Sequence, residues 1–132
     1  MGCSFTATCV VTTFYHNDRF YNSTPNEISG LTIATADALL KDNAKRHYGK
    51  SYKDWARRYP SAGYGGKFDL WVHSDSLEPY NSHGNGSAMR ISPVGWAFAT
   101  LEETLGEAKR SADATHNHPG MVYREGMYCT IR

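Results

Sequence analysis

The sequence YNSHGNGSAMR at residues 80–90 places two glycines one residue apart among polar residues and then passes into an apolar segment. Because glycine has no Cβ, the backbone N–H groups around Gly84 and Gly86 can approach a ligand closely. If a helix begins at or just after Ser87, these amides lie at the positive end of its dipole and can receive a phosphate or another anion. The alternative is an ordinary turn in which Asn85 and Ser87 only cap the helix, and a short glycine motif alone favours that turn.

The residues before this loop have helical patterning. Thr24-Pro25-Asn26-Glu27 combines a capping residue, a proline in the first turn and an acid three residues after the cap. This pattern predicts a helix over about 25–48, with Gly49 as its C-terminal stop. A second helix is predicted over 51–59, with Pro60 ending it and aromatic core residues on one face: Tyr52, Trp55 and Tyr59. Residues 68–72 are apolar and read equally as helix or strand.

The segment after the loop is predicted to be helical over about 93–115. Pro93 begins its first part, and Thr100 begins its second part, with Glu103 completing another capping box. The spacing of four apolar residues predicts the face that packs into the core: Leu101, Leu105, Ala108 and Ala112.

Both ends of the chain have a different pattern. Residues 3–15 (CSFTATCVVTTFY) are rich in threonine, valine and aromatic residues, and residues 120–132 alternate with a period of two. Strands are therefore predicted within 1–23 and 120–132, pairing in a small antiparallel sheet around a mostly helical centre. The expected fold class is α+β, in a single domain spanning 1–132.

Composition is that of an ordinary globular protein, with 40% hydrophobic and 20% charged residues. Fourteen basic against thirteen acidic side chains give no electrostatic reason to expect nucleic acid or an anionic membrane as a partner. No apolar run is long enough to span a bilayer. Three cysteines without a C-x-x-C spacing indicate reduced thiols, so a cytoplasmic location is expected.

The strongest candidate site joins the glycine loop to Arg90 and His116. An anion cradle, a cation and an imidazole at the end of a helix suit a ligand that carries phosphate or ribose. Each side chain has a simpler alternative. His116 would act as a cationic cap at a helix C-terminus, and Arg90 would form a surface salt bridge.

Metal and catalytic residues are harder to assign. His116 and His118, with His73, Asp75 or His83, do not match a recognisable zinc spacing. The acidic residues are scattered, and Glu27 is already accounted for by helix capping. The sequence therefore predicts no metal ligand and no catalytic residue.

Four stretches carry a family resemblance: Leu31–Leu40, Tyr59–Pro60 with Gly63–Gly66, Tyr80–Gly95, and Thr115–Pro119. Through them, residues 31–119 resemble the central part of the ADP-ribosylglycohydrolase (DraG-like) family. The strings GNGSAMR and THNHP are its most specific elements.

Members of that family are mostly helical, bind a pair of magnesium ions and remove ADP-ribose from modified side chains. The resemblance implies that His116 lies near the ADP-ribose moiety and that five loop residues contact it: Ser82, Gly84, Asn85, Gly86 and Ser87.

The departures from the family pattern concern its metal sites. The family has a T-D-D-[ST] motif where this chain has Asn26-Glu27-Ile28-Ser29, which contains one acid. A second acidic motif would lie beyond Arg132, and residues 3–15 replace a helix that carries a catalytic glutamate. Both metal-binding ends are thus missing or rewritten, so a magnesium cofactor is expected only if the chain is a hydrolase.

These observations lead to three functional hypotheses. The preferred one is a non-catalytic pseudoenzyme that binds an ADP-ribose-like ligand through the Gly84–Ser87 loop, or a target protein, for example as a phage-type inhibitor of a host defence system. The alternative is a compact hydrolase that removes ADP-ribose from modified proteins. The third is a truncated product without a selected function. Non-catalytic binding is preferred because loss of metal ligands abolishes metal-assisted hydrolysis more readily than binding by backbone amides.

Overall fold

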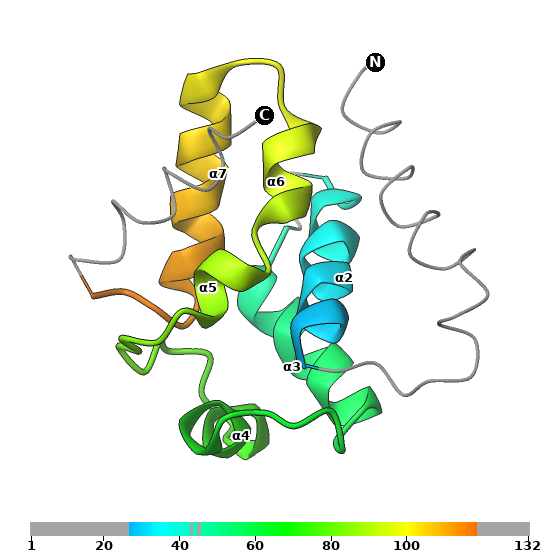
Figure 1. Cartoon of the computed structure of the whole chain (residues 1–132), viewed down its shortest axis with the longest axis vertical. Helices are drawn as coiled ribbons and strands as arrows, with labels where there is room; N and C mark the ends of the chain where they lie inside the picture. The colour runs from blue at the N-terminus through cyan, green and yellow to red at the C-terminus, as the bar shows by residue number, and fades with distance from the viewer. Residues whose placement is uncertain (1–26, 43, 45, 119–132) are drawn as a thin grey trace.

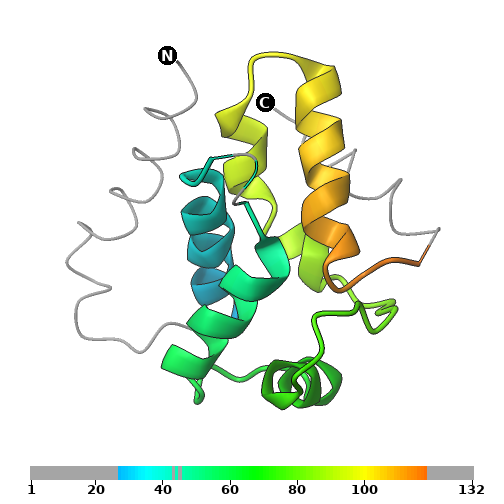
Figure 2. The same ribbon diagram turned by 180° about the vertical axis from the view of Figure 1, so that it is seen from behind.

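A computed structural model describes residues 27–42, 44 and 46–118, and this part of the chain is built from helices alone. In chain order they are α2 (Glu27–Leu39), α3 (Tyr48–Arg58), α4 (Gly66–His73), α5 (Gly86–Met89), α6 (Ser92–Ala97) and α7 (Leu101–Asp113). Figure 1 shows α2, α6 and α7 side by side, with α4 at the lower end below α5. Seen from behind, α3 lies across α2 (Figure 2). None of the helices in these residues is long and apolar enough to cross a membrane.

The expected α+β fold class is wrong. The described residues contain no strand and no sheet, so the observed class is all-helical. The predicted strands within 1–23 and 120–132 fall outside the described residues. The α+β assignment rested on β-branched and aromatic residues at the two ends, whereas every element of the described residues is a helix, as the 3.6-residue apolar spacing of the central segments indicates.

The helix predicted over 25–48 is confirmed over the residues of α2, but its predicted C-terminal end is wrong. α2 ends at Leu39, and α3 begins at Tyr48, so Gly49 lies buried inside α3 and does not end a helix. His47 precedes α3, and its Nδ1 accepts a hydrogen bond from the Lys50 backbone N–H at 3.3 Å. A histidine cap is not among the residues that usually mark a helix start.

Small residues on α2 allow α3 and α6 to pack closely against it. Ala34 and Ala38 of α2 are fully buried in the core with Tyr52 of α3 and Val94 of α6. The prediction that the aromatic residues of α3 face the core is confirmed for Tyr52 and Trp55, while Tyr59 is half-buried at its edge.

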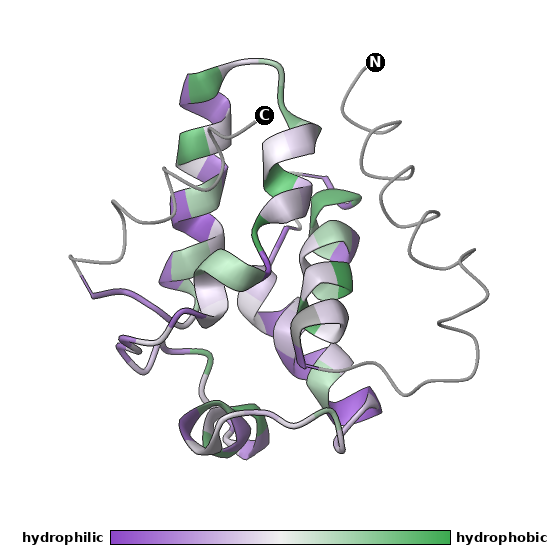
Figure 3. Ribbon diagram, viewed as in Figure 1, coloured by the Kyte–Doolittle hydropathy of each residue, from purple (hydrophilic) through white to green (hydrophobic). Residues whose placement is uncertain are grey.

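The face of α7 that packs into the core differs from the predicted face. Leu101 and Leu105 are 53% and 37% exposed, although Ala108 and Ala112 are buried as expected. Polar and apolar residues alternate along α7 in Figure 3. Thr104 and Ser111 are buried instead of the leucines. Their hydroxyl groups are satisfied by hydrogen bonds, which removes most of the cost of burying them.

A polar network at the centre joins three helices. The Tyr52 hydroxyl lies 3.2 Å from Thr35 Oγ1 of α2 and 3.0 Å from Ser111 Oγ of α7. Thr35 Oγ1 also donates to the Leu31 carbonyl at 2.9 Å. The orientation of the Tyr52 ring is therefore fixed from both sides.

Residues 68–72, which read as helix or strand, belong to α4. Two cations of α3 hold the C-terminal end of this helix. Arg57 donates from Nε and Nη2 to the Val72 carbonyl, and the buried Lys53 Nζ donates to the Ser74 and Ser76 carbonyls at 2.7 and 2.6 Å. Cations are favoured at this end of a helix dipole. This anchoring fixes where the opposite end of α4 lies.

The predicted helix cap at Thr100 is confirmed, although Glu103 pairs with the Thr100 hydroxyl and not with its backbone N–H as in a full capping box. Thr100 Oγ1 accepts from the Glu103 N–H at 3.3 Å and donates to Glu103 Oε2 at 2.7 Å. We expect Thr100→Ala to lower the free energy of unfolding by about 1 kcal/mol, measured by urea denaturation. Glu102→Ala serves as the control, and its effect should stay within a few tenths of a kcal/mol. Equal effects of the two substitutions would contradict a capping role for Thr100.

Candidate functional site

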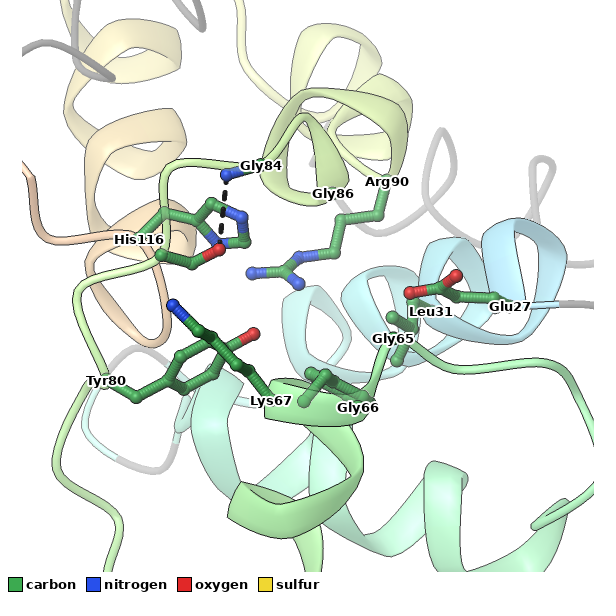
Figure 4. A pocket seen from close by; sticks show the side chains of 12 residues that line it. Glu27, Leu31, Gly65, Gly66, Lys67, Tyr80, Gly84, Gly86, Arg90 and His116 are labelled. Carbon is green, nitrogen blue, oxygen red and sulfur yellow. Dashed lines mark hydrogen bonds between the residues drawn. The ribbon is translucent and has the colours of Figure 1, made fainter.

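A pocket of about 280 Å³ opens between the start of α4 and the loop that leads into α5 (Figure 4). Its walls come from segments far apart in the sequence: the start of α2, the start of α4, residues 80–90 and His116, which follows α7. The lining residues are Glu27, Leu31, Gly65, Gly66, Lys67, Phe68, Tyr80, Ser82, Gly84, Gly86, Arg90 and His116.

The glycine loop forms one wall of the pocket. The Ser82 backbone N–H donates to the Thr115 carbonyl at 3.1 Å, and Ser82 Oγ accepts from the Gly84 N–H at 3.2 Å. A helix does begin here, but α5 is a single turn of four residues starting at Gly86. One turn cannot build the dipole of a long helix, so the predicted helix-dipole cradle is weaker than expected. Asn85 makes no side-chain capping hydrogen bond, so the simple capping alternative does not describe it.

Gly84 and Gly86 leave space beside His116. A Cβ added at Gly86 would lie 3.5 Å from His116 Cε1, and one added at Gly84 would lie 3.9 Å from His116 Nε2. These are ordinary van der Waals distances, so the glycines are not needed to avoid a clash. Their effect is to leave the pocket open in front of the imidazole.

Arg90 lies beneath the pocket and not on the surface. It is 1% exposed, its guanidinium carbon lies 4.0 Å from the centre of the Tyr52 ring, and Nη2 donates to Thr115 Oγ1 at 2.6 Å. Its Nε has no hydrogen-bond partner in the part of the chain that the structure describes. The surface salt bridge considered for Arg90 is therefore wrong. A buried guanidinium with an unused N–H group favours an anionic partner.

His116 is buried beside Arg90. The imidazole is 3% exposed, and Nδ1 lies 2.7 Å from Thr115 Oγ1. Burial, assisted by the nearby Arg90 charge, lowers the pKa of His116 to about 4. The side chain is thus neutral at pH 7, and the interpretation of His116 as a cationic cap of a helix C-terminus is wrong.

This pKa predicts a pH dependence of stability. The unfolded histidine keeps its ordinary pKa of 6.5, so the unfolded chain takes up the proton first as the pH falls. The contribution of neutral His116 to the free energy of unfolding is fully present above about pH 6.5. It is lost progressively towards pH 4, by at most about 3 kcal/mol. Urea denaturation of the wild type and His116→Gln between pH 4 and 7 measures it. The variant should show the weaker pH dependence, and identical slopes would assign the effect to other groups.

The structure separates the predicted site residues into two groups. Five of them line the pocket: Ser82, Gly84, Gly86, Arg90 and His116. Asn85 is exposed outside the lining, and Ser87 is fully buried beneath the loop, with no partner for Oγ in the described residues.

The sequence analysis missed the opposite wall, which consists of Gly65, Gly66 and Lys67 at the start of α4 and of Glu27 at the start of α2. Gly65 precedes α4 and provides no side-chain cap, so the first N–H groups of this helix lack that partner. Two signals pointed to this wall. The Gly63–Gly66 stretch belongs to the family resemblance, and Glu27 lies in the neighbourhood of the family's metal motif.

The residues around the pocket do not fit a pair of magnesium ions. Magnesium requires several oxygen ligands, whereas Glu27 is the single carboxylate of the lining. Within residues 27–42, 44 and 46–118, no three histidine, cysteine, aspartate or glutamate side chains are grouped to hold a metal. His83 and His118 pack ring to ring, with centroids 4.2 Å apart, but belong to no such group.

The fold and pocket together define an all-helical protein whose pocket is lined by a buried arginine, a lysine and two glycine-containing segments. A family model described as ADP-ribosylglycohydrolase matches residues 10–131, so the chain belongs to this family, whose fold is all-helical. This confirms the resemblance seen over 31–119, and the match extends beyond it on both sides. No solved structure matches the chain.

Proposed function

We propose that this protein binds ADP-ribose, or a closely related phosphate-bearing ligand, in the pocket between α4 and α5 and does not hydrolyse it. The main support for the proposal is Arg90, which is buried next to the glycine loop. Its Nε has no hydrogen-bond partner among the described residues. Membership of the ADP-ribosylglycohydrolase family supports ADP-ribose as the ligand class.

The two walls of the pocket supply complementary groups for an anion. On one side Arg90 provides a fixed cation, and on the other Lys67 extends from the first turn of α4 (Figure 4). The N-terminal N–H groups of α4 add a partial positive charge at the same wall, because Gly65 leaves them without a side-chain cap. Two cations and a helix N-terminus suit a ligand with more than one phosphate group.

The chemistry of the lining supports binding more than hydrolysis. Metal-assisted hydrolysis needs carboxylates that hold the ions and activate water. Glu27 supplies one carboxylate, and the rest of the lining supplies cations, glycines, hydroxyl groups and aromatic rings. Those groups bind a phosphate ligand without a metal ion.

Hydrolase activity is the second candidate, and the position of Glu27 favours it. This carboxylate lines the pocket, and the family resemblance puts it in the neighbourhood of the family's metal motif. Glu27→Gln distinguishes the candidates, because it removes a metal ligand but also removes a negative charge near a bound phosphate.

Calorimetric titration with ADP-ribose in magnesium and in EDTA tests the proposal. We expect similar binding in both, and binding by Glu27→Gln that equals or exceeds that of the wild type. Absence of heat in both buffers contradicts binding in this pocket. A parallel assay measures release of ADP-ribose from ADP-ribosylated arginine and serine proteins at high protein concentration. Release that Glu27→Gln abolishes would favour the hydrolase.

A further inference from the structure

Three buried groups form a hydrogen-bonded chain that leads from Arg90 to the pocket. Arg90 Nη2 lies 2.6 Å from Thr115 Oγ1, and Thr115 Oγ1 lies 2.7 Å from His116 Nδ1. Thr115 is fully buried, and Arg90 and His116 are 1% and 3% exposed. Water therefore has little access to these groups, and their donors and acceptors must form hydrogen bonds with one another.

The donors and acceptors of these groups fix the direction of the chain. A guanidinium only donates, so Arg90 places a hydrogen on one lone pair of Thr115 Oγ1. The buried Thr115 hydroxyl has one hydrogen of its own, which needs an acceptor. In the part of the chain that the structure describes, His116 Nδ1 is the group within reach that can accept it. If Nδ1 carried a proton instead, Thr115 Oγ1 would accept twice and its own hydrogen would be left unpaired.

The other imidazole nitrogen faces the pocket. A Cβ at Gly86 would lie 3.7 Å from His116 Nε2, and one at Gly84 would lie 3.9 Å from it, so this edge of the ring looks onto the glycine loop. His116 itself lines the pocket (Figure 4). No described residue forms a hydrogen bond with Nε2, which leaves this atom for a ligand.

We propose that Thr115 is a positioning residue that holds His116 in its neutral Nε2–H tautomer, so that the imidazole donates one hydrogen bond into the pocket. The ligand group that it recognises is an acceptor oxygen, such as a phosphate oxygen. The identity of that ligand rests on the proposed function, whereas the tautomer does not depend on any ligand.

In this tautomer His116 acts as a neutral hydrogen-bond donor and not as a cation. The charge that attracts an anion comes from Arg90, and His116 adds a directional donor without a second buried positive charge. The opposite tautomer would present Nε2 as an acceptor and would select a ligand hydroxyl group instead of a phosphate oxygen.

Long-range ¹H–¹⁵N NMR of the histidine side chains tests the proposal at pH 7. In the wild type we expect His116 to show a protonated Nε2 and an unprotonated Nδ1. Thr115→Ser keeps a hydroxyl group and should preserve this pattern. Thr115→Val has nearly the same shape without the hydroxyl group, and its His116 should lose the Nε2–H preference. A wild-type spectrum with the proton on Nδ1 overturns the proposal, even if Thr115→Val does not fold.

Titration with ADP-ribose provides the second readout. Removal of the hydroxyl in Thr115→Val should weaken ADP-ribose binding by about tenfold, because His116 Nε2–H is no longer held in place to donate its hydrogen bond to the ligand. Thr115→Ser should bind within about twofold of the wild type, because its hydroxyl keeps the chain intact. If the wild type shows the Nε2–H tautomer and binds no ADP-ribose, the proposed ligand fails while the role of Thr115 stands. If Thr115→Val keeps the Nε2–H tautomer, the role of Thr115 fails whatever the binding result.

Discussion

Replacing Arg90 with methionine is expected to weaken the binding of ADP-ribose by about 100-fold, which corresponds to roughly 2.7 kcal/mol. Hydrogen bonds to charged groups contribute about 1.5–3 kcal/mol each, and Arg90 is the buried cation of the pocket. Methionine keeps an unbranched apolar side chain against the Tyr52 ring but provides no N–H group. Calorimetric titration with ADP-ribose measures the effect.

The same variant should lose little stability, which distinguishes a ligand-binding residue from a structural one. The variant loses the hydrogen bond to Thr115 Oγ1 and the cation–π contact with Tyr52, but removing a buried cation that forms no ion pair in the described residues relieves its desolvation cost and offsets that loss. Arg58→Met is a matched control, because Arg58 is exposed and lies over Trp55, outside the pocket lining. Unchanged affinity in Arg90→Met would remove the main support for the proposed function. So would an equal loss of affinity in the two variants.

Replacing Tyr52 with alanine is expected to give the largest loss of stability, about 4 kcal/mol in the free energy of unfolding. The side chain is fully buried between α2 and α7, so its removal leaves a large cavity. The substitution also removes the hydrogen bonds to Thr35 and Ser111 and the aromatic face beneath Arg90. Urea denaturation monitored by circular dichroism measures the loss.

Two matched variants divide this effect into its parts. Tyr52→Phe keeps the ring and should cost about 1–2 kcal/mol, the net value of the lost hydrogen bonds. Tyr59→Ala removes a tyrosine from the half-buried edge of the same core and should cost less than Tyr52→Ala, since it leaves a smaller cavity. If Tyr59→Ala proved as damaging as Tyr52→Ala, the central network would not have the stabilising role inferred for it.

The local features of the helices were predictable because they depend on residues close together in the chain. Thr100 and Glu103 lie three residues apart, and the hydrogen bonds between them cap α7 at the predicted residue. The core face of α7 was not predictable from leucine spacing. Thr104 and Ser111 are buried because each hydroxyl forms a hydrogen bond, and the partner of Ser111 lies on a different helix.

The pocket was only half predictable. The glycine loop, Arg90 and His116 were singled out from their own sequence motifs, and the structure places all three around one pocket. The wall formed by Gly65, Gly66 and Lys67 reaches the site because Lys53 and Arg57 hold the far end of α4. The family resemblance marked Gly63–Gly66, but it did not indicate that this stretch faces the glycine loop, since that contact depends on hydrogen bonds made by another helix.

The sequence alone determined the family, through GNGSAMR and THNHP, and it determined where several helices begin. It also indicated that the family's acidic metal motif is reduced to one acid at Glu27. The tertiary structure alone decided that Arg90 is a buried cation, that His116 is neutral, and that Lys67 faces them across the pocket. The physical reason is that burial and charge proximity set these properties, and both arise from residues that are distant in the chain.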